Sequence, residues 1–259
     1  MPLRWLGPFS LRPLARIGIA AFLAAAGGVA AAADLTVSAA ASLTNAFQEI
    51  GAAFEAANPG QKVEFNFAAS GPLLQQIAKG APVDVFASAD QETMNQAEQQ
   101  RLVVAATRAN FVRNALVVVV PADRVPPRTL ADLAAPAVRQ IAIGVTASVP
   151  VGRYTKAVLE KAGLWPQVEA KMIGAQSVRQ VLDYVARGEV DAGFVYATDA
   201  ALMPGKLKVA FTVPTEQPVL YPIAVVAASA NAPVAGRFVA YVNSPPAQAV
   251  LARHGFAPP

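Results

Sequence analysis

The feature that most constrains the fold is an alternation of apolar strands and amphipathic helices in the first part of the chain. The apolar run 35–39 predicts a buried strand, and the residues after it have apolar side chains at helical spacing. These are Leu43, Phe47, Ile50 and Phe54. Two further strands, at 63–67 and 83–88, flank a second helical pattern. An order of strand, helix, strand, helix, strand predicts a parallel α/β sheet.

The same order begins again after residue 140, with strands expected at 141–145, 172–173 and 192–195. Two longer apolar strands, 116–120 and 219–227, lie outside the two repeats. We interpret these as paired crossings between two α/β lobes, with the closing helices 235–241 and 247–253 returning to the first lobe. The sequence therefore predicts a first lobe of residues 34–114 plus 226–259 and a second lobe of residues 115–225.

The first 33 residues have the pattern of a secretory signal peptide. Three arginines precede an apolar run, and the run ends in small residues, Ala31 to Ala33, before Asp34. The apolar run is near the lower limit of a membrane span, so an uncleaved anchor is the alternative. Cleavage after residue 33 would leave an exported chain with almost no net charge. We therefore expect the chain to be exported.

The composition also excludes several classes of protein. The sequence has no cysteine, which excludes a lipid-anchored cysteine and disulfide bonds. It has no basic cluster interleaved with aromatic residues, so nothing indicates a nucleic-acid partner.

Small or hydroxyl residues precede four of the predicted helices, near Ser42, Ser70, Pro150 and Ser177. Taken alone, such a serine is most simply an N-cap. The four turns also follow strand ends, where ligands bind in open α/β sheets. Helix starts carry unpaired N–H groups and a partial positive charge, so together they could bind an anion.

These turns contain no lysine, and we interpret Arg153 and Arg179, just inside two of the helices, as solvated surface charges. Uncharged donors suit an anion that is already fully ionised, because a protonated anion would need an acceptor. Asp199 is the one nearby carboxylate that could serve as an acceptor.

Six stretches resemble the periplasmic molybdate-binding proteins of ABC importers, which have a two-lobe type II periplasmic binding-protein fold. They are AAASLTNA, FAASGP, GAPVDVFASAD, SVPVGRY, SVRQVL and FVYATDA, between residues 39 and 200, and the tail LARHGF also fits. The resemblance implies two mostly parallel sheets flanked by helices, with the ligand cleft between them. It also implies that the protein is a monomer without a cofactor. The protein would carry molybdate, and tungstate as well, to a transmembrane permease. Molybdenum would be present only in the oxyanion.

The resemblance also implies the site residues. The hydroxyls of Ser42 and Ser70 in the first lobe correspond to ligands of the oxyanion. In the second lobe the backbone N–H groups of Val151 and Val178 and the hydroxyl of Tyr196 complete the set. Relatives often have alanine where this chain has Val151, and some have serine where it has Ala69.

Three other functions remain open at this stage. A secreted serine hydrolase could use Ser42 or Ser70, but neither lies in G-x-S-x-G and the only histidine is His254. A receptor for sulfate, thiosulfate or phosphate would use similar helix starts. An iron receptor would need clustered oxygen ligands, and the tyrosines are scattered along the sequence, at Tyr154, Tyr184, Tyr196, Tyr221 and Tyr241.

Overall fold

The computed structural model describes residues 1–3 and 34–259. The predicted signal peptide, apart from its first three residues, lies outside the described residues. Within the described part, no helix combines the length and the hydropathy needed to cross a membrane.

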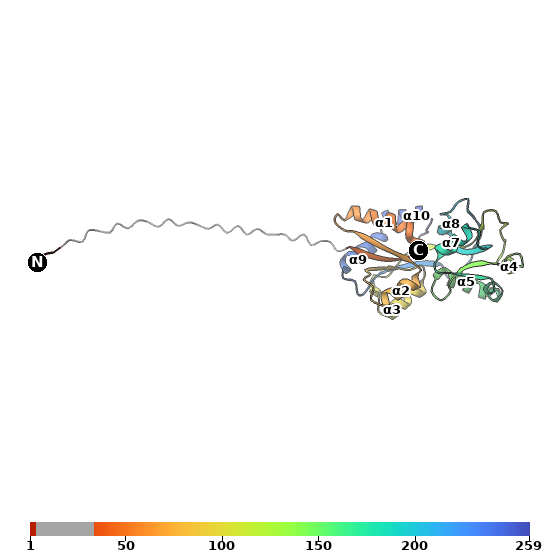
Figure 1. Cartoon of the computed structure of the whole chain (residues 1–259), viewed down its shortest axis with the longest axis horizontal. Helices are drawn as coiled ribbons and strands as arrows, with labels where there is room; N and C mark the ends of the chain where they lie inside the picture. Colours follow the sequence, from red (N-terminus) through yellow and green to blue (C-terminus); the bar gives the residue numbers. More distant parts are fainter. Residues whose placement is uncertain (4–33) are drawn as a thin grey trace. The chain divides into compact units, whose positions relative to one another are not determined.

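Residues 34–259 form two five-stranded mixed sheets, each with its own helices (Figure 1). The strands of the first sheet are ordered β2-β1-β3-β10-β4. Strand β1 is parallel to β2 and β3, whereas β10 is antiparallel to β3 and β4. The bounds are β1 Leu35–Ala40, β2 Val63–Ala68, β3 Val85–Ala87, β4 Ala109–Asn114 and β10 Val219–Val225.

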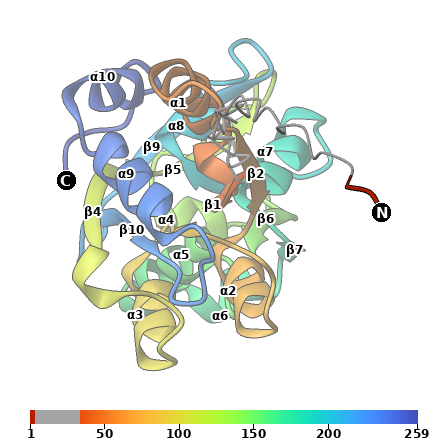
Figure 2. The same cartoon turned by 90° about the vertical axis from the view of Figure 1, so that its left-hand side faces the viewer.

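The helices of the first sheet cover both of its faces, as Figure 2 shows. On one face, Phe54 of α1 packs edge-on against Phe238 of α9, with ring centroids 5.2 Å apart. On the other face, apolar side chains of α2 and α3 pack with Phe86 in a separate cluster. The bounds are η1 Ala41–Leu43, α1 Thr44–Ala57, α2 Ser70–Ala78, α3 Gln91–Gln99, η2 Ala105–Thr107, α9 Ala232–Val242 and α10 Pro245–Arg253.

The second sheet repeats this arrangement in the order β7-β6-β8-β5-β9. Strand β6 is parallel to β7 and β8, and β5 is antiparallel to β8 and β9. Its strands are β5 Leu116–Pro121, β6 Ile141–Gly144, β7 Met172–Ala175, β8 Ala192–Tyr196 and β9 Leu207–Val213. Its helices are α4 Leu130–Ala134, α5 Pro150–Lys161, α6 Trp165–Glu169, α7 Val178–Ala186 and α8 Ala197–Ala200.

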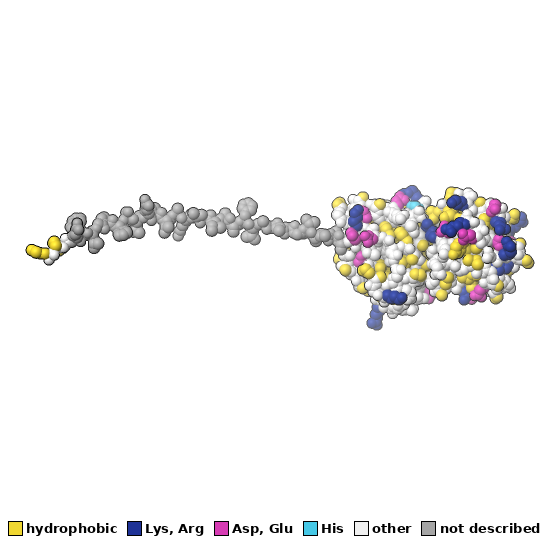
Figure 3. All heavy atoms as spheres, in the orientation of Figure 1, with side chains coloured by type: hydrophobic (Ala, Val, Ile, Leu, Met, Phe, Trp, Pro, Cys, Tyr) yellow, Lys and Arg dark blue, Asp and Glu magenta, His cyan; other side chains and the backbone are white. Residues whose placement is uncertain are grey.

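We call the first sheet with its helices the first lobe and the second sheet with its helices the second lobe. The chain passes from one to the other at Ala115 and returns through residues 214–218, between β9 and β10. On the face in Figure 3, acidic and basic side chains lie next to one another over the second lobe.

The prediction that the two long apolar strands are the crossings between the lobes is wrong, because each lies within one sheet. Strand β5 pairs with β8 and β9, whereas β10 pairs with β3 and β4. The expectation that Val219–Val225 belongs to the second lobe is therefore also wrong, and the return crossing precedes this strand. An apolar run shows that a strand is buried, but it carries no information about which sheet buries it.

Strands β4 and β9 were not predicted. In β9 the middle residues are exposed or half-buried, and Val209 is among the exposed large apolar residues. Strands β4 and β9 lie at the edges of their sheets, where fewer side chains are covered, so their apolar pattern is weak.

Candidate functional site

A small cavity lies between the two lobes, at the ends of strands and the starts of helices. About 10 Å³ at its centre is open to a water-sized sphere, which is about the room that one water molecule needs. All five predicted ligand residues line it, together with six apolar neighbours, and none of these side chains is charged. The first lobe contributes Ala40, Ala41, Ser42, Ala69, Ser70 and Ala89, and the second lobe contributes Val149, Pro150, Val151, Val178 and Tyr196.

The two serines of the first lobe are not N-caps. Ser42 lies inside η1, and Ser70 is the first residue of α2, whose N-cap is Ala69. The Oγ of Ser42 lies 2.9 Å from the hydroxyl of Tyr221, and the Oγ of Ser70 accepts a hydrogen bond from Ala89 N at 3.0 Å. Both hydroxyls therefore stand at the cavity wall and do not satisfy their own helix.

The second lobe presents backbone donors at two helix starts. Val151 follows Pro150 in the first turn of α5, and Val178 is the first residue of α7. The first four N–H groups of a helix have no acceptor within it, and neither of these two has a hydrogen-bond partner among the described residues. Ser177 is the N-cap of α7, since its Oγ accepts from Gln180 N at 3.2 Å. The reciprocal bond of a capping box does not form, because Gln180 Oε1 accepts from Gln176 N and not from Ser177 N.

Tyr196 ends β8, and its hydroxyl is the clearest unsatisfied group of the site. The residue is 1% exposed, and its hydroxyl has no hydrogen-bond partner within the described part of the chain. Burial raises the pKa of Tyr196 well above its usual value, so the hydroxyl stays protonated. A buried polar atom without a partner is costly, and a ligand that accepted its proton would remove that cost.

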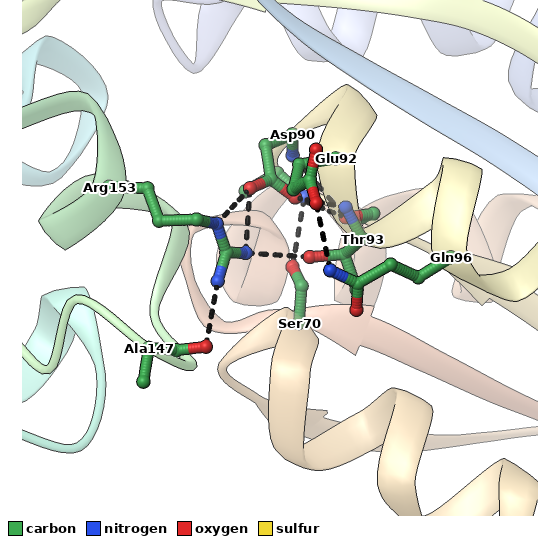
Figure 4. A network of polar contacts seen from close by, with 9 residues as sticks. Ser70, Asp90, Glu92, Thr93, Gln96, Ala147 and Arg153 are labelled. Atoms are coloured by element: carbon green, nitrogen blue, oxygen red, sulfur yellow. Dashed lines mark hydrogen bonds and ion pairs between the residues drawn. The ribbon is translucent and has the colours of Figure 1, made fainter. Parts of the chain in front are cut away.

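The interpretation of Arg153 and Arg179 as solvated charges is wrong. Arg153 of α5 crosses to the first lobe, where its Nε donates to Asp90 Oδ2 at 2.8 Å and its Nη2 to Thr93 Oγ1 at 2.6 Å (Figure 4). Arg179 of α7 donates from Nε to Asp199 Oδ1 at 2.5 Å and from Nη2 to Asn45 of the first lobe at 3.0 Å. Both charges are used in ion pairs beside the cavity and leave its lining neutral.

Asp199 is fully buried, and burial raises its pKa to about 6 despite the neighbouring Arg179. Its Oδ2 has no hydrogen-bond partner in the described residues, while Oδ1 is held by Arg179. It does not line the cavity. The suggestion that Asp199 accepts a proton from a ligand therefore has no geometric support.

The lobes also touch through backbone close to the cavity. Gly71, next to Ser70, donates from its N–H to the carbonyl oxygen of Ser148 at 3.1 Å. A Cβ at Gly71 would collide with that same oxygen, so this close approach requires glycine.

The groups that a serine hydrolase or an iron receptor requires are not assembled among the described residues. Among the described residues neither serine is hydrogen-bonded to a histidine, and His254 instead has its Nε2 3.0 Å from Glu49. The described part of the chain holds no cluster of three or more His, Cys, Asp or Glu that could bind a metal ion. Tyr196 and Tyr221, although separated in sequence, do come together, with ring centroids 5.8 Å apart.

Sequence reasoning missed two residues that contact the site. Tyr221 lies in the apolar strand β10 and reaches Ser42, and Asn114 at the end of β4 reaches Tyr221. A tyrosine within an otherwise apolar buried strand is a signal that could have been used, because a buried tyrosine hydroxyl needs a partner.

The chain is similar over its whole length to known binding proteins. The family model described as bacterial extracellular solute-binding protein matches residues 35–257. The molybdate-binding protein ModA of Escherichia coli is 36% identical over 263 residues, covering 99% of both chains. That of Haemophilus influenzae is 34% identical, covering 95% of this chain and 99% of its own.

The same likeness holds in three dimensions. The solved periplasmic molybdate-binding protein of Azotobacter vinelandii has 26% identity and a TM-score of 0.76, covering 87% of this chain and 99% of its own. The prediction of a two-lobe type II periplasmic binding-protein fold is confirmed by this neighbour and by the two helix-flanked sheets. The chain therefore belongs to the family of bacterial extracellular solute-binding proteins, in the group that holds the molybdate-binding proteins.

Proposed function

We propose that this protein is the periplasmic binding component of an ABC importer and that its cargo is molybdate, with tungstate bound in the same way. The observation that carries the proposal is the cavity itself, where three hydroxyls and two helix starts from both lobes meet without a charged side chain. Its relatives at 34–36% identity are named for molybdate binding.

The site chemistry supports a small, fully ionised oxyanion. Ser42, Ser70 and Tyr196 offer hydroxyl protons, and Val151 and Val178 offer backbone N–H groups in the first turn of their helices. Hydrogen bonds to a charged group are each worth about 1.5–3 kcal/mol. Five of them supply about 7.5–15 kcal/mol against the several kcal/mol lost on association, and the upper part of that range corresponds to micromolar or tighter binding.

The arrangement of the lobes supports a role in transport. The ligand contacts come from both lobes, and only Ala115 and residues 214–218 connect the two sheets. Ligand binding would therefore favour a closed form by a hinge motion at these two connections. We propose that the closed monomer delivers the oxyanion to a transmembrane permease after export by the predicted signal peptide.

A thermal-shift series tests the cargo. The mature chain is heated with equal concentrations of molybdate, tungstate, sulfate and phosphate, because a ligand that binds only the folded state raises the melting temperature. Molybdate and tungstate are expected to give the largest rise. A rise with sulfate equal to that with molybdate would overturn the assignment of the cargo.

Calorimetric titration of two variants tests the site. Tyr196→Phe removes a hydroxyl that has no protein partner in the described residues, so it should weaken molybdate binding by about 10–150-fold and leave the fold intact. Ser42→Ala should act in the same direction. Tyr241→Phe is the matched control, because this half-buried tyrosine lies in α9, away from the cavity lining. Unchanged affinity in both site variants would refute the proposed residues.

A further inference from the structure

The orientation of the Asn114 side chain is fixed by a neighbouring backbone group. Ala115 N donates to Asn114 Oδ1 at 2.9 Å, and a backbone N–H can only donate. The oxygen of the amide must therefore face Ala115. The Nδ2 group then faces Thr198 Oγ1 at 2.8 Å and the Tyr221 hydroxyl at 3.3 Å, and it can only donate to them.

The amide of Asn114 in turn sets the direction of the next hydrogen bond. The Tyr221 oxygen accepts from Asn114, so its own proton is left for another acceptor. Among the described residues its other hydrogen-bond partner is Ser42 Oγ, at 2.9 Å. Burial raises the pKa of Tyr221 well above its usual value, so this proton is always present. Tyr221 is therefore the donor and Ser42 the acceptor.

Ser42 is then left with one proton and no protein acceptor for it. Its Oγ is occupied by Tyr221, and the residue lines the cavity. The hydroxyls of Ser70 and Tyr196 also keep a proton that they can donate into the cavity. Ser70 accepts from the backbone of Ala89, and the hydroxyl of Tyr196 has no partner in the part of the chain described. All three hydroxyls can donate into the cavity.

We propose that Asn114 and Tyr221 are positioning residues that hold Ser42 as a hydrogen-bond donor, so that the cavity accepts oxyanions without a proton and rejects those that keep one. This inference rests on the proposed function, since it concerns the selectivity of the same anion site. An oxyanion that keeps a proton, such as hydrogen phosphate, must donate to something in the cavity. Ser42 and Ser70 already accept from Tyr221 and from Ala89, so such a proton would turn to the Tyr196 hydroxyl, which has no partner among the described residues. That hydroxyl would then accept from the anion in place of donating to it, which costs binding energy.

We call the hydrogen bonds from Asn114 to Tyr221 and from Tyr221 to Ser42 the relay. Two variants act on this relay in different ways. Tyr221→Phe removes the donor to Ser42, so the serine can rotate and accept. Asn114→Asp keeps the size of the side chain and its bond from Ala115, but it places an acceptor against Tyr221. The Tyr221 proton would then turn toward residue 114, and Ser42 would donate to Tyr221 and present its lone pairs to the cavity.

The test compares molybdate with phosphate at about pH 8, where phosphate is mainly the dianion that keeps one proton. Because the two anions then carry equal charge, the added negative charge of Asn114→Asp weakens the binding of both to a similar extent. The dissociation constant of phosphate divided by that of molybdate therefore reports only which groups of the cavity donate hydrogen bonds. The wild-type chain should prefer molybdate strongly. The ratio should fall by about tenfold or more in Tyr221→Phe and further in Asn114→Asp, whereas Tyr241→Phe should leave it unchanged.

A double-mutant cycle checks that Tyr221 acts through Ser42. In the Ser42→Ala background, Tyr221→Phe should produce no further loss of molybdate affinity. Melting temperatures without ligand show whether each variant is folded. Equal molybdate-to-phosphate ratios in folded wild type, Tyr221→Phe and Asn114→Asp would overturn this inference, as would full additivity in the cycle. A wild-type chain that fails to bind molybdate would overturn the proposed function instead.

Discussion

Arg153 of the second lobe reaches Asp90 of the first, with its Nε 2.8 Å from Oδ2. Asp90 is also the N-cap of α3, where its Oδ1 accepts from Thr93 N at 3.1 Å. Figure 4 shows the guanidinium between this helix start and the carbonyl of Ala147, with Ser70 close by. One arginine therefore joins the lobes directly beside a predicted ligand residue.

Replacing Arg153 should favour the open form. In Arg153→Met the ion pair and the bond to Thr93 are lost, but no cavity-lining group changes. The arginine side chain is 23% exposed, so solvent screening limits the effect. We expect molybdate to bind about three- to tenfold more weakly, mainly through faster release. Stopped-flow measurement of release checks this, with Lys156→Met, which breaks an exposed ion pair to Glu160 within the same helix, as the control. Equal release rates would contradict a role in closure.

A second prediction about closure concerns Gly71. A Cβ at this position would collide with the carbonyl of Ser148, so Gly71→Ala should push the lobes apart and weaken binding. Alanine is the better helix former, so a lower affinity would not come from helix propensity. Gly236→Ala is the matched control, because nothing lies within 4 Å of its added Cβ and α9 should become more stable by about 0.5–1 kcal/mol. Small-angle scattering with and without molybdate would show whether Gly71→Ala still closes.

The sequence could predict the parts of the site that depend on local pattern. The pattern of strand ends and helix starts pointed to the turns that hold Ser42, Ser70, Val151 and Val178, whereas Tyr196 was indicated only by the resemblance. The structure brings all five residues to one cavity. The relation between the two long apolar strands could not be predicted, because a strand buried on both sides looks alike in either sheet.

Long-range polar partners were the other part that could not be predicted. Arg153 and Asp90 are 63 positions apart, and Ser42 and Tyr221 are 179 positions apart. Nothing local in the sequence distinguishes an arginine that crosses between lobes from one in solvent. For the same reason the relay from Asn114 became visible only when β4 and β10 were seen to be neighbours.

Val178→Pro tests a backbone donor without changing its neighbours. Proline is favoured at the first position of a helix, and Ser177 before it is extended, as a residue preceding proline should be. The substitution therefore removes the N–H while keeping the helix. Titration should show molybdate binding weakened by about 10–150-fold at nearly unchanged melting temperature. Val178→Ala, which keeps the N–H, should bind almost as the wild type does. Equal losses in both variants would assign the effect to the side chain.

Asp199 makes stability depend on pH in a direction opposite to that of most carboxylates. Its pKa is raised from 3.8 to about 6 by burial, so the folded chain holds this proton more tightly than the unfolded chain. The stabilisation from that proton is complete below about pH 4 and is lost as the pH rises through 6. It amounts to about 2–3 kcal/mol.

In Asp199→Asn this loss should disappear, so the unfolding free energy of the variant should fall less between pH 5 and pH 7.5 than that of the wild type. Urea denaturation at both pH values measures the difference, and Asp123→Asn, in an exposed loop, should behave as the wild type does. A fall in the Asp199→Asn variant as large as that in the wild type would show that Asp199 stays ionised throughout, held by Arg179.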